Sequence, residues 1–154
     1  MTTPIIKLPD LDATRRLASD IADRVEVPQT IALNGTLGVG KTQWIRFFSQ
    51  AIGADAGQVT SPTYVLHQRY RGRLLIHHFD FYRLETSDEV WNLGIDELFE
   101  QPAVVLIEWA DKFADCLPDD YLQIKLSHHE VGGRQAELFA TGPTSAKLLS
   151  QLTH

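Results

Sequence analysis

The hydrophobic side chains of the first half of the chain follow two spacings, one that suits helices and one that suits buried strands. In residues 10–25 the apolar positions fall on one helical face and Asp10 is placed to cap the first turn, which predicts an amphipathic helix. Residues 43–52 show the same helical spacing and end before Gly53, a residue type that often closes helices. Between them, the apolar run at residues 30–33 predicts a buried parallel strand.

The second half of the chain alternates strand-like and helical segments. Residues 64–70 and 73–79 flank an Arg-Gly pair, which predicts a β-hairpin that turns at this glycine. Residues 85–99 predict one or two short helices broken at Gly94. Residues 103–107, which follow a proline, form the run AVVLI and are the best candidate for a central strand.

The last part of the chain predicts the edge of a sheet. Residues 122–126 and 135–140 alternate as an antiparallel pair would, around a Gly-Gly turn, and residues 144–152 predict a terminal helix. The whole order predicts an α/β fold, with a mainly parallel central sheet and antiparallel edge strands. Since 154 residues with 44% hydrophobic composition suit one ordinary domain, we expect residues 1–154 to form a single domain.

A glycine-rich loop, GTLGVGKT at residues 35–42, lies between the first predicted strand and the helix that follows it. Its spacing suits a loop whose backbone N–H groups point at phosphate oxygens, because side chains at the glycine positions would obstruct them. The N-terminus of the next helix also favours a phosphate. In this pattern Lys41 neutralises the β and γ phosphates, and the Thr42 hydroxyl binds Mg²⁺. The loop predicts a P-loop NTPase-like three-layer sandwich, with nucleotide contacts from Thr36, Leu37, Gly38, Val39, Gly40, Lys41 and Thr42.

Two carboxylates follow predicted strands and are candidates for a second Mg²⁺ anchor. Ligands of open α/β sheets gather beyond the carboxyl ends of the strands, and a P-loop metal needs a carboxylate there. Glu108 ends the 103–107 run and is our first candidate, although Asp is the commoner residue in P-loop proteins. Asp80 ends the preceding strand and is the rival, either for metal binding or for water activation. Strand alternation puts His78 on the side of Asp80 and His77 on the other, which disfavours a zinc site at this histidine pair.

A polar segment, residues 54–62, precedes the predicted hairpin and is rich in turn formers, which predicts a loop near the ligand. Hydroxyl groups around its proline either face the γ-phosphate and Mg²⁺ or cap a turn, and the sequence leaves both interpretations open. The candidate switch residues are Thr60, Ser61, Pro62, Thr63 and Tyr64.

The charge of the chain restricts its partners. With 14 Lys and Arg against 20 Asp and Glu, the net charge is −6, so the overall field repels RNA and a nucleic-acid contact has to be local or mediated by a partner. Arg69, Arg71 and Arg73 on the predicted hairpin are a local candidate for such a contact, and the alternative is that they form a charged edge that discourages aggregation. Cys116, the only cysteine, excludes an intrachain disulfide. No stretch reaches the roughly 18 apolar residues of a membrane span and no signal peptide is evident, so we expect a cytoplasmic location.

Five short motifs occur in order along the chain, namely GTLGVGKT, VTSPTY, HHFDFYRL, GIDE and LIEW. Together they resemble the TsaE family, small P-loop ATPases of tRNA threonylcarbamoyladenosine (t6A) biosynthesis, over roughly residues 5–140. The resemblance implies ATP and Mg²⁺ as ligands, association with the TsaB and TsaD proteins, and at most indirect or weak contact with tRNA. It also implies that residues 60–64 form a switch-like loop, that Asp80 and Glu108 serve the metal and hydrolysis site, and that Trp109 closes the nucleotide pocket.

These observations suggest a mechanism in which Thr42 and Glu108 hold Mg²⁺ and Asp80 orients the attacking water. Because Arg83 is the only candidate for a catalytic arginine within the chain, we expect slow intrinsic hydrolysis that partners accelerate.

Three other functions are alternatives to an ATPase. A small-molecule kinase would need an arginine-rich lid, and residues 94–118 contain no convincing one. A nucleotide-sensing assembly module would use ATP binding, without significant turnover, to change its affinity for a partner. A GTPase is disfavoured because the NKxD base-reading motif is missing.

Overall fold

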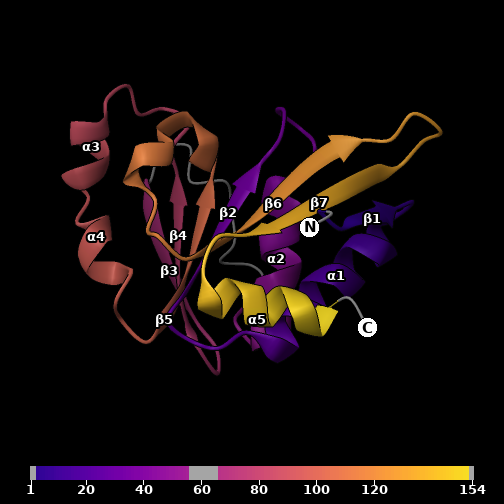
Figure 1. Cartoon of the computed structure of the whole chain (residues 1–154), viewed down its shortest axis with the longest axis horizontal. Coiled ribbons are helices and arrows are strands. Elements are labelled where there is room, and N and C mark those ends of the chain that lie inside the picture. Colours follow the sequence, from indigo (N-terminus) through magenta and orange to yellow (C-terminus); the bar gives the residue numbers. More distant parts are fainter. Residues whose placement is uncertain (1–2, 56–65, 153–154) are drawn as a thin grey trace.

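The computed structural model describes residues 3–55 and 66–152, and the segments below belong to these residues. Seven strands of the described chain form one sheet in the order β1-β7-β6-β2-β5-β4-β3 (Figure 1). The strands are β1 (Ile5–Leu8), β2 (Gln29–Asn34), β3 (His67–Arg71), β4 (Leu75–Asp80), β5 (Ala103–Glu108), β6 (Tyr121–His128) and β7 (Arg134–Ala140). The helices are α1 (Leu11–Arg24), α2 (Lys41–Ile52), α3 (Ser87–Trp91), α4 (Ile95–Leu98), the 3₁₀ helix η2 (Ala110–Cys116) and α5 (Pro143–Leu152).

The middle of the sheet is parallel and its edges are antiparallel. Strand β2 pairs in parallel with both β5 and β6, and β4 pairs in parallel with β5. Strand β3 is antiparallel to β4, and β7 is antiparallel to both β6 and β1. The prediction of a parallel core with antiparallel edge strands is therefore confirmed. Strand β1 was not predicted, because its four residues pair with residues far along the chain.

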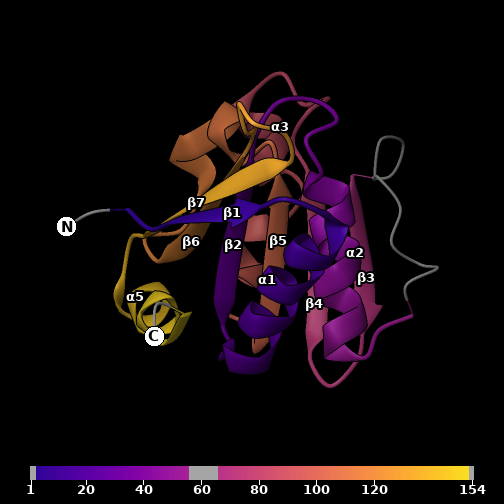
Figure 2. The ribbon, with the colours of Figure 1, turned by 90° about the vertical axis from the view of Figure 1, so that its right-hand side faces the viewer.

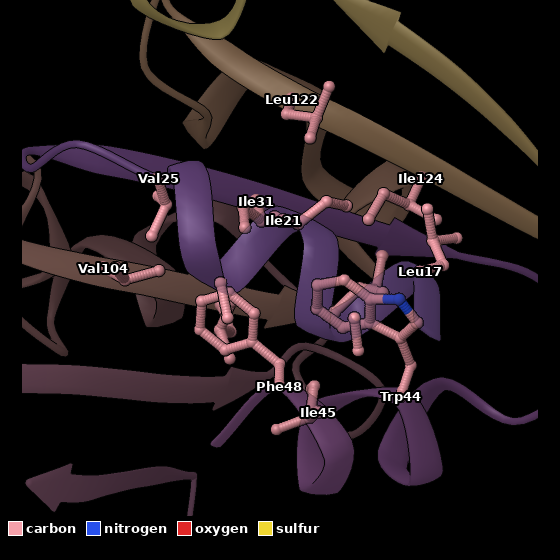
Figure 3. Close-up of a cluster of buried hydrophobic side chains, with 14 of the residues drawn as sticks. Leu17, Ile21, Val25, Ile31, Trp44, Ile45, Phe48, Val104, Leu122 and Ile124 are labelled. Atoms are coloured by element: carbon pink, nitrogen blue, oxygen red, sulfur yellow. The ribbon is translucent and has the colours of Figure 1, made fainter. Parts of the chain in front are cut away.

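Helices cover both faces of the sheet and create two hydrophobic cores. Helices α1 and α2 lie side by side on one face (Figure 2), and their apolar residues pack on β2, β5 and β6. In this core Trp44 stacks on Phe48 with ring centroids 5.3 Å apart (Figure 3). The other core joins α3, α4 and η2 to alternate residues of β4 and β5. The predicted three-layer sandwich is therefore the observed architecture.

Local signals account for several element boundaries. The Asp10 carboxylate accepts a hydrogen bond from the Ala13 N–H at 2.8 Å, which caps α1 as predicted. Gly53 follows α2, and Gly94 separates α3 from α4, both as expected. The predicted strand 73–79 was wrong at its start, because Arg73 belongs to the turn and β4 begins at Leu75. The Arg73 guanidinium instead donates a hydrogen bond to the carbonyl of Ala22, which links the hairpin turn to α1.

None of the helices in residues 3–55 and 66–152 is long and apolar enough to cross a membrane.

A histidine pair, of which His77 is buried and His67 half-buried, joins β3 to β4. His67 Nε2 and His77 Nδ1 are 2.8 Å apart, and the His67 ring stacks on Phe79. Among the described residues, His77 Nε2 has no hydrogen-bond partner although it is buried. Burial, reinforced by the charges of His67 and Arg69, lowers the pKa of His77 from its usual 6.5 to about 4.

The lowered pKa of His77 predicts that the fold is less stable in acid. Because the unfolded chain binds a proton on His77 near pH 6.5 and the folded chain only near pH 4, stability is complete above pH 6.5 and falls as the pH drops toward 4. We expect this residue to remove on the order of 2 to 3 kcal/mol from the unfolding free energy between pH 7 and pH 4. Urea denaturation at the two pH values should show a smaller difference in His77→Phe, whereas the exposed control His128→Gln should match the parent. An unchanged pH dependence in His77→Phe would show that other groups cause the acid sensitivity.

Candidate functional site

The glycine-rich loop connects the end of β2 to the start of α2, at the carboxyl edge of the parallel strands. Its first residue, Gly35, has φ 145°, and a Cβ there would lie 2.5 Å from the carbonyl oxygen of Leu126 on β6. Only glycine fits between the loop and this neighbouring strand. The loop then turns directly into the first turn of α2, where free backbone N–H groups suit an anion.

Lys41 is the cation at the centre of this loop. Its ammonium group donates to the carbonyl oxygens of Gly35 at 2.6 Å and Thr36 at 3.0 Å, and it lies 4.0 Å from the ring centroid of Trp109. Burial lowers the pKa of Lys41, and the nearby charge of Glu108 opposes this shift. The ammonium group is thus held beside the loop by contacts that its flexible side chain can exchange for phosphate oxygens.

The hydroxyl of Thr42 meets the carboxylate of Glu108. Thr42 Oγ1 donates to Glu108 Oε1 at 2.8 Å, although the two residues are distant in sequence. Glu108 is the last residue of β5, and in the parallel register it lies opposite Asp80 on β4. Both predicted carboxylates therefore stand at the same edge of the sheet as the loop.

Glu108 is also held from its other side by a buried polar chain. Its Oε2 atom accepts a hydrogen bond from His78 Nε2 at 2.7 Å, and His78 Nδ1 lies 2.8 Å from the Tyr70 hydroxyl. The same hydroxyl donates to Gln68 at 2.6 Å. His78 is fully buried and Glu108 nearly so, which fixes the rotamer of the carboxylate. The predicted strand alternation is confirmed here, because His78 and Asp80 share the α2 side of the sheet.

Asp80 lies next to Glu108 but in a different environment. Its carboxylate accepts a hydrogen bond from the Tyr82 N–H at 2.9 Å. Burial raises the pKa of Asp80, the Tyr82 N–H opposes the shift, and the charge of Glu108 adds to it. A carboxyl group with a raised pKa that faces a phosphate cradle is suited to take up a proton.

Trp109 follows Glu108 and turns the chain out of the sheet. It has φ 58°, the only non-glycine residue with positive φ in residues 3–55 and 66–152. Its N–H donates to Leu33 at 3.0 Å, and its ring lies 5.0 Å from that of Tyr82. Strained backbone of this kind often marks a functional site, and here it places the indole over Lys41.

These side chains surround one pocket. It is lined by Leu11, Leu37, Gly38, Gly40, Lys41, Thr42, Gln43, Asp80, Tyr82, Glu108, Trp109 and Arg134. The structure thus brings together most of the residues that the sequence singled out. Two loop residues do not line this pocket, because the side chain of Val39 is fully buried and Thr36 lines a neighbouring pocket.

Two further predictions do not lead to described residues of this pocket, and a charged residue that lines the pocket was not predicted. The switch residues 60–64 lie outside the described part of the chain. Arg83, the predicted candidate for a catalytic arginine, is exposed and does not line the pocket. Arg134 does line it and was missed, because no local motif links the start of β7 to a loop so distant in sequence.

A phosphate cradle at the start of a helix, a buried lysine within it and a threonine paired with a strand-end carboxylate define a P-loop nucleotide-binding protein. Comparison with known proteins narrows this class. The model of the family described as "Threonylcarbamoyl adenosine biosynthesis protein TsaE" matches residues 8–136. The chain belongs to the TsaE family.

Individual relatives agree with this assignment. The tRNA threonylcarbamoyladenosine biosynthesis protein TsaE of Haemophilus influenzae is 34% identical over 125 residues, which cover 80% of this chain and 78% of that protein. The protein of the same name from Bacillus subtilis is 32% identical over 143 residues, or 92% of this chain and 89% of that protein. The crystal structure of Bacillus subtilis YdiB superposes with a TM-score of 0.81 at 26% identity, covering 99% of this chain and 97% of the other. The predicted family and fold are both confirmed.

Proposed function

We propose that this chain binds ATP with Mg²⁺ and hydrolyses it as a component of tRNA t6A modification, acting with TsaB and TsaD proteins. The observation that carries the proposal is the contact between Thr42 Oγ1 and Glu108 Oε1. This contact joins the end of the phosphate-binding loop to the end of β5. In P-loop proteins a carboxylate at such a strand end binds the metal ion.

The residues around this contact fit Mg²⁺. This ion prefers oxygen ligands, takes few of them from the protein and keeps several water molecules. Thr42 and Glu108 offer such oxygens, and within residues 3–55 and 66–152 no cluster of three or more His, Cys, Asp or Glu side chains competes as a metal site. When bound there, Mg²⁺ would neutralise charge that develops on the phosphate oxygens.

Each side chain then has a distinct role. The loop N–H groups and Lys41 bind the β and γ phosphates, because both present positive charge to the same pocket. Asp80 orients the attacking water and accepts its proton, which its raised pKa favours. Trp109 covers the ammonium group of Lys41 and shields it from solvent.

We favour ATP over GTP because the NKxD motif is missing from the sequence. Calorimetric titration with both nucleotides in the presence of Mg²⁺ should show tighter binding of ATP. A clear preference for GTP would exclude the ATPase proposal.

Reconstitution tests the proposed role in t6A formation. Unmodified tRNA, the threonylcarbamoyl donor, TsaB and TsaD are incubated with ATP, with and without this chain, and t6A is measured by mass spectrometry of the nucleosides. We expect t6A to accumulate over repeated turnovers only when the chain is present and the ATP can be hydrolysed. Equal t6A yields without the chain would exclude the proposed role, whereas full activity with a non-hydrolysable analogue would favour a nucleotide-sensing assembly module.

His78 should act as a positioning residue for Glu108. Without its Nε2–H the Glu108 carboxylate keeps Thr42 but loses the contact that fixes its other oxygen. Since removing such an outer contact typically weakens metal affinity 10- to 100-fold, we expect His78→Phe to raise the Mg²⁺ concentration for half-maximal ATPase activity by about that factor. His78→Gln, which retains a donor, should recover part of the loss, and the exposed control His128→Gln should match the parent. An unchanged Mg²⁺ dependence in His78→Phe would show that His78 does not position Glu108.

A further inference from the structure

Arg134 brings a guanidinium group to the phosphate-binding loop from the far end of the sequence. It is the first residue of β7, yet it lines the same pocket as Lys41 and Thr42. A Cβ built on Gly40 would lie 2.9 Å from Arg134 Nη1. The guanidinium group therefore rests against the backbone of the loop at its last glycine.

The hairpin that carries Arg134 is held in place by its surroundings. Arg134 pairs with His128 across the β6–β7 ladder and with Leu8 on β1. Just before it, Gly133 has φ 72°, and a Cβ there would lie 2.7 Å from Pro9 Cα. The turn thus packs tightly against the residue after β1, so the base of the Arg134 side chain has a fixed position.

The charge of this guanidinium group has no acidic partner among the described residues. Within residues 3–55 and 66–152, Arg134 forms no salt bridge, although it is half-buried. The carboxylates of its pocket, Asp80 and Glu108, are engaged elsewhere, with Tyr82 and with Thr42 and His78. A half-buried cation of this kind beside a phosphate cradle is complementary to an anion.

The order of the strands shows which part of a nucleotide Arg134 would meet. Glu108 and Asp80 end β5 and β4, on one side of β2, whereas β7 lies beyond β6 on the other side. If the γ-phosphate and Mg²⁺ lie at Thr42 and Glu108, as the proposed function requires, the rest of the nucleotide extends from the loop toward β7. Arg134 is therefore at the end of the pocket away from the bond that breaks.

We infer that Arg134 is a nucleotide-binding residue that contacts the α-phosphate of the bound nucleotide. This inference rests on the proposed function, because it takes the orientation of the nucleotide from it. Arg134 adds affinity and serves ATP and ADP alike, since both carry an α-phosphate. An arginine that stabilised the transferred γ-phosphoryl group would instead distinguish ATP from ADP.

Calorimetric titration of ATP and ADP tests this assignment on the whole chain. Because hydrogen bonds to charged groups are the strong ones, Arg134→Gln should raise the dissociation constants of both nucleotides by about 10- to 100-fold and leave their ratio unchanged. Arg134→Lys should lose less, since it keeps the charge but not the planar fork. Arg71→Gln, an exposed arginine on the opposite edge strand, is the matched control and should match the parent.

Other outcomes would overturn the assignment. Unchanged dissociation constants in both Arg134 variants would remove Arg134 from the nucleotide site, and a loss confined to ATP would place it at the γ-phosphate. If the parent chain bound neither ATP nor ADP, the proposed function itself would fail. A thermal unfolding midpoint of Arg134→Gln equal to that of the parent, measured without nucleotide, would show that a loss of affinity does not come from misfolding.

Discussion

Replacing Lys41 with alanine is expected to weaken ATP binding by about two to three orders of magnitude, because truncating a buried, hydrogen-bonded charge costs several kcal/mol. The Lys41 ammonium group is nearly buried and donates to two carbonyl oxygens of its own loop. No other lysine among the described residues lines the pocket, and the Arg134 guanidinium, which does line it, rests against Gly40 and not among the carbonyl groups that hold Lys41. Fluorescent-nucleotide displacement or calorimetry would measure the dissociation constant.

The matched control for this variant is Lys147→Ala. Lys147 lies on α5, and its exposed ammonium group pairs only weakly with Glu26 at the surface. We expect the control to bind ATP as the parent does. If Lys41→Ala also kept the parent affinity, Lys41 would not be part of the phosphate cradle.

Replacing Glu108 with glutamine is expected to lower the rate of ATP hydrolysis by about 10²- to 10³-fold, as removal of one electrostatic stabiliser does in other enzymes. The substitution keeps the size of the side chain and its contact with Thr42, but it removes the charge next to the proposed Mg²⁺ position. ATP affinity should fall less than the rate, because Lys41 and the loop N–H groups remain. A steady-state assay of phosphate release at saturating ATP measures the effect, with the exposed Glu130→Gln as control.

The double variant Thr42→Ala with Glu108→Gln tests whether the two residues act on one ion. Residues that serve a common function are strongly non-additive, so the double variant should be little worse than the poorer single variant. If the fold-losses in hydrolysis rate of the two single variants multiplied in the double variant, Thr42 and Glu108 would act independently. The proposal of a shared metal site would then be wrong.

The parts of the fold that the sequence predicts well depend on local patterns. Helix α1 follows from one apolar face and a capping aspartate, and the glycine loop follows from its own spacing. Strand β1 lacks such a signal, because only its pairing with β7 makes residues 5–8 a strand. The edge of the sheet is therefore visible only once distant segments have been brought together.

In the candidate site, too, local sequence patterns predict some residues, whereas others depend on contacts between distant segments. Alternation along β4 correctly places His78 with Asp80, but it does not show that the β4–β5 register brings His78 to Glu108. The contact of Arg134 with Gly40 depends on the packing of the β6–β7 hairpin, which no spacing in the sequence encodes. Motifs thus identify the candidate phosphate and metal ligands, whereas the residues proposed to orient or supplement them are found only in the three-dimensional structure.

Phosphate release under four conditions tests most directly whether ATP hydrolysis in this pocket serves t6A formation. The parent chain and Glu108→Gln are each assayed alone and with TsaB, TsaD and tRNA. We predict slow release by the parent alone, faster release with its partners, and little release by Glu108→Gln in either case. Equally fast release by the parent with and without partners, or parent-like release by Glu108→Gln, would contradict partner-coupled hydrolysis at this site.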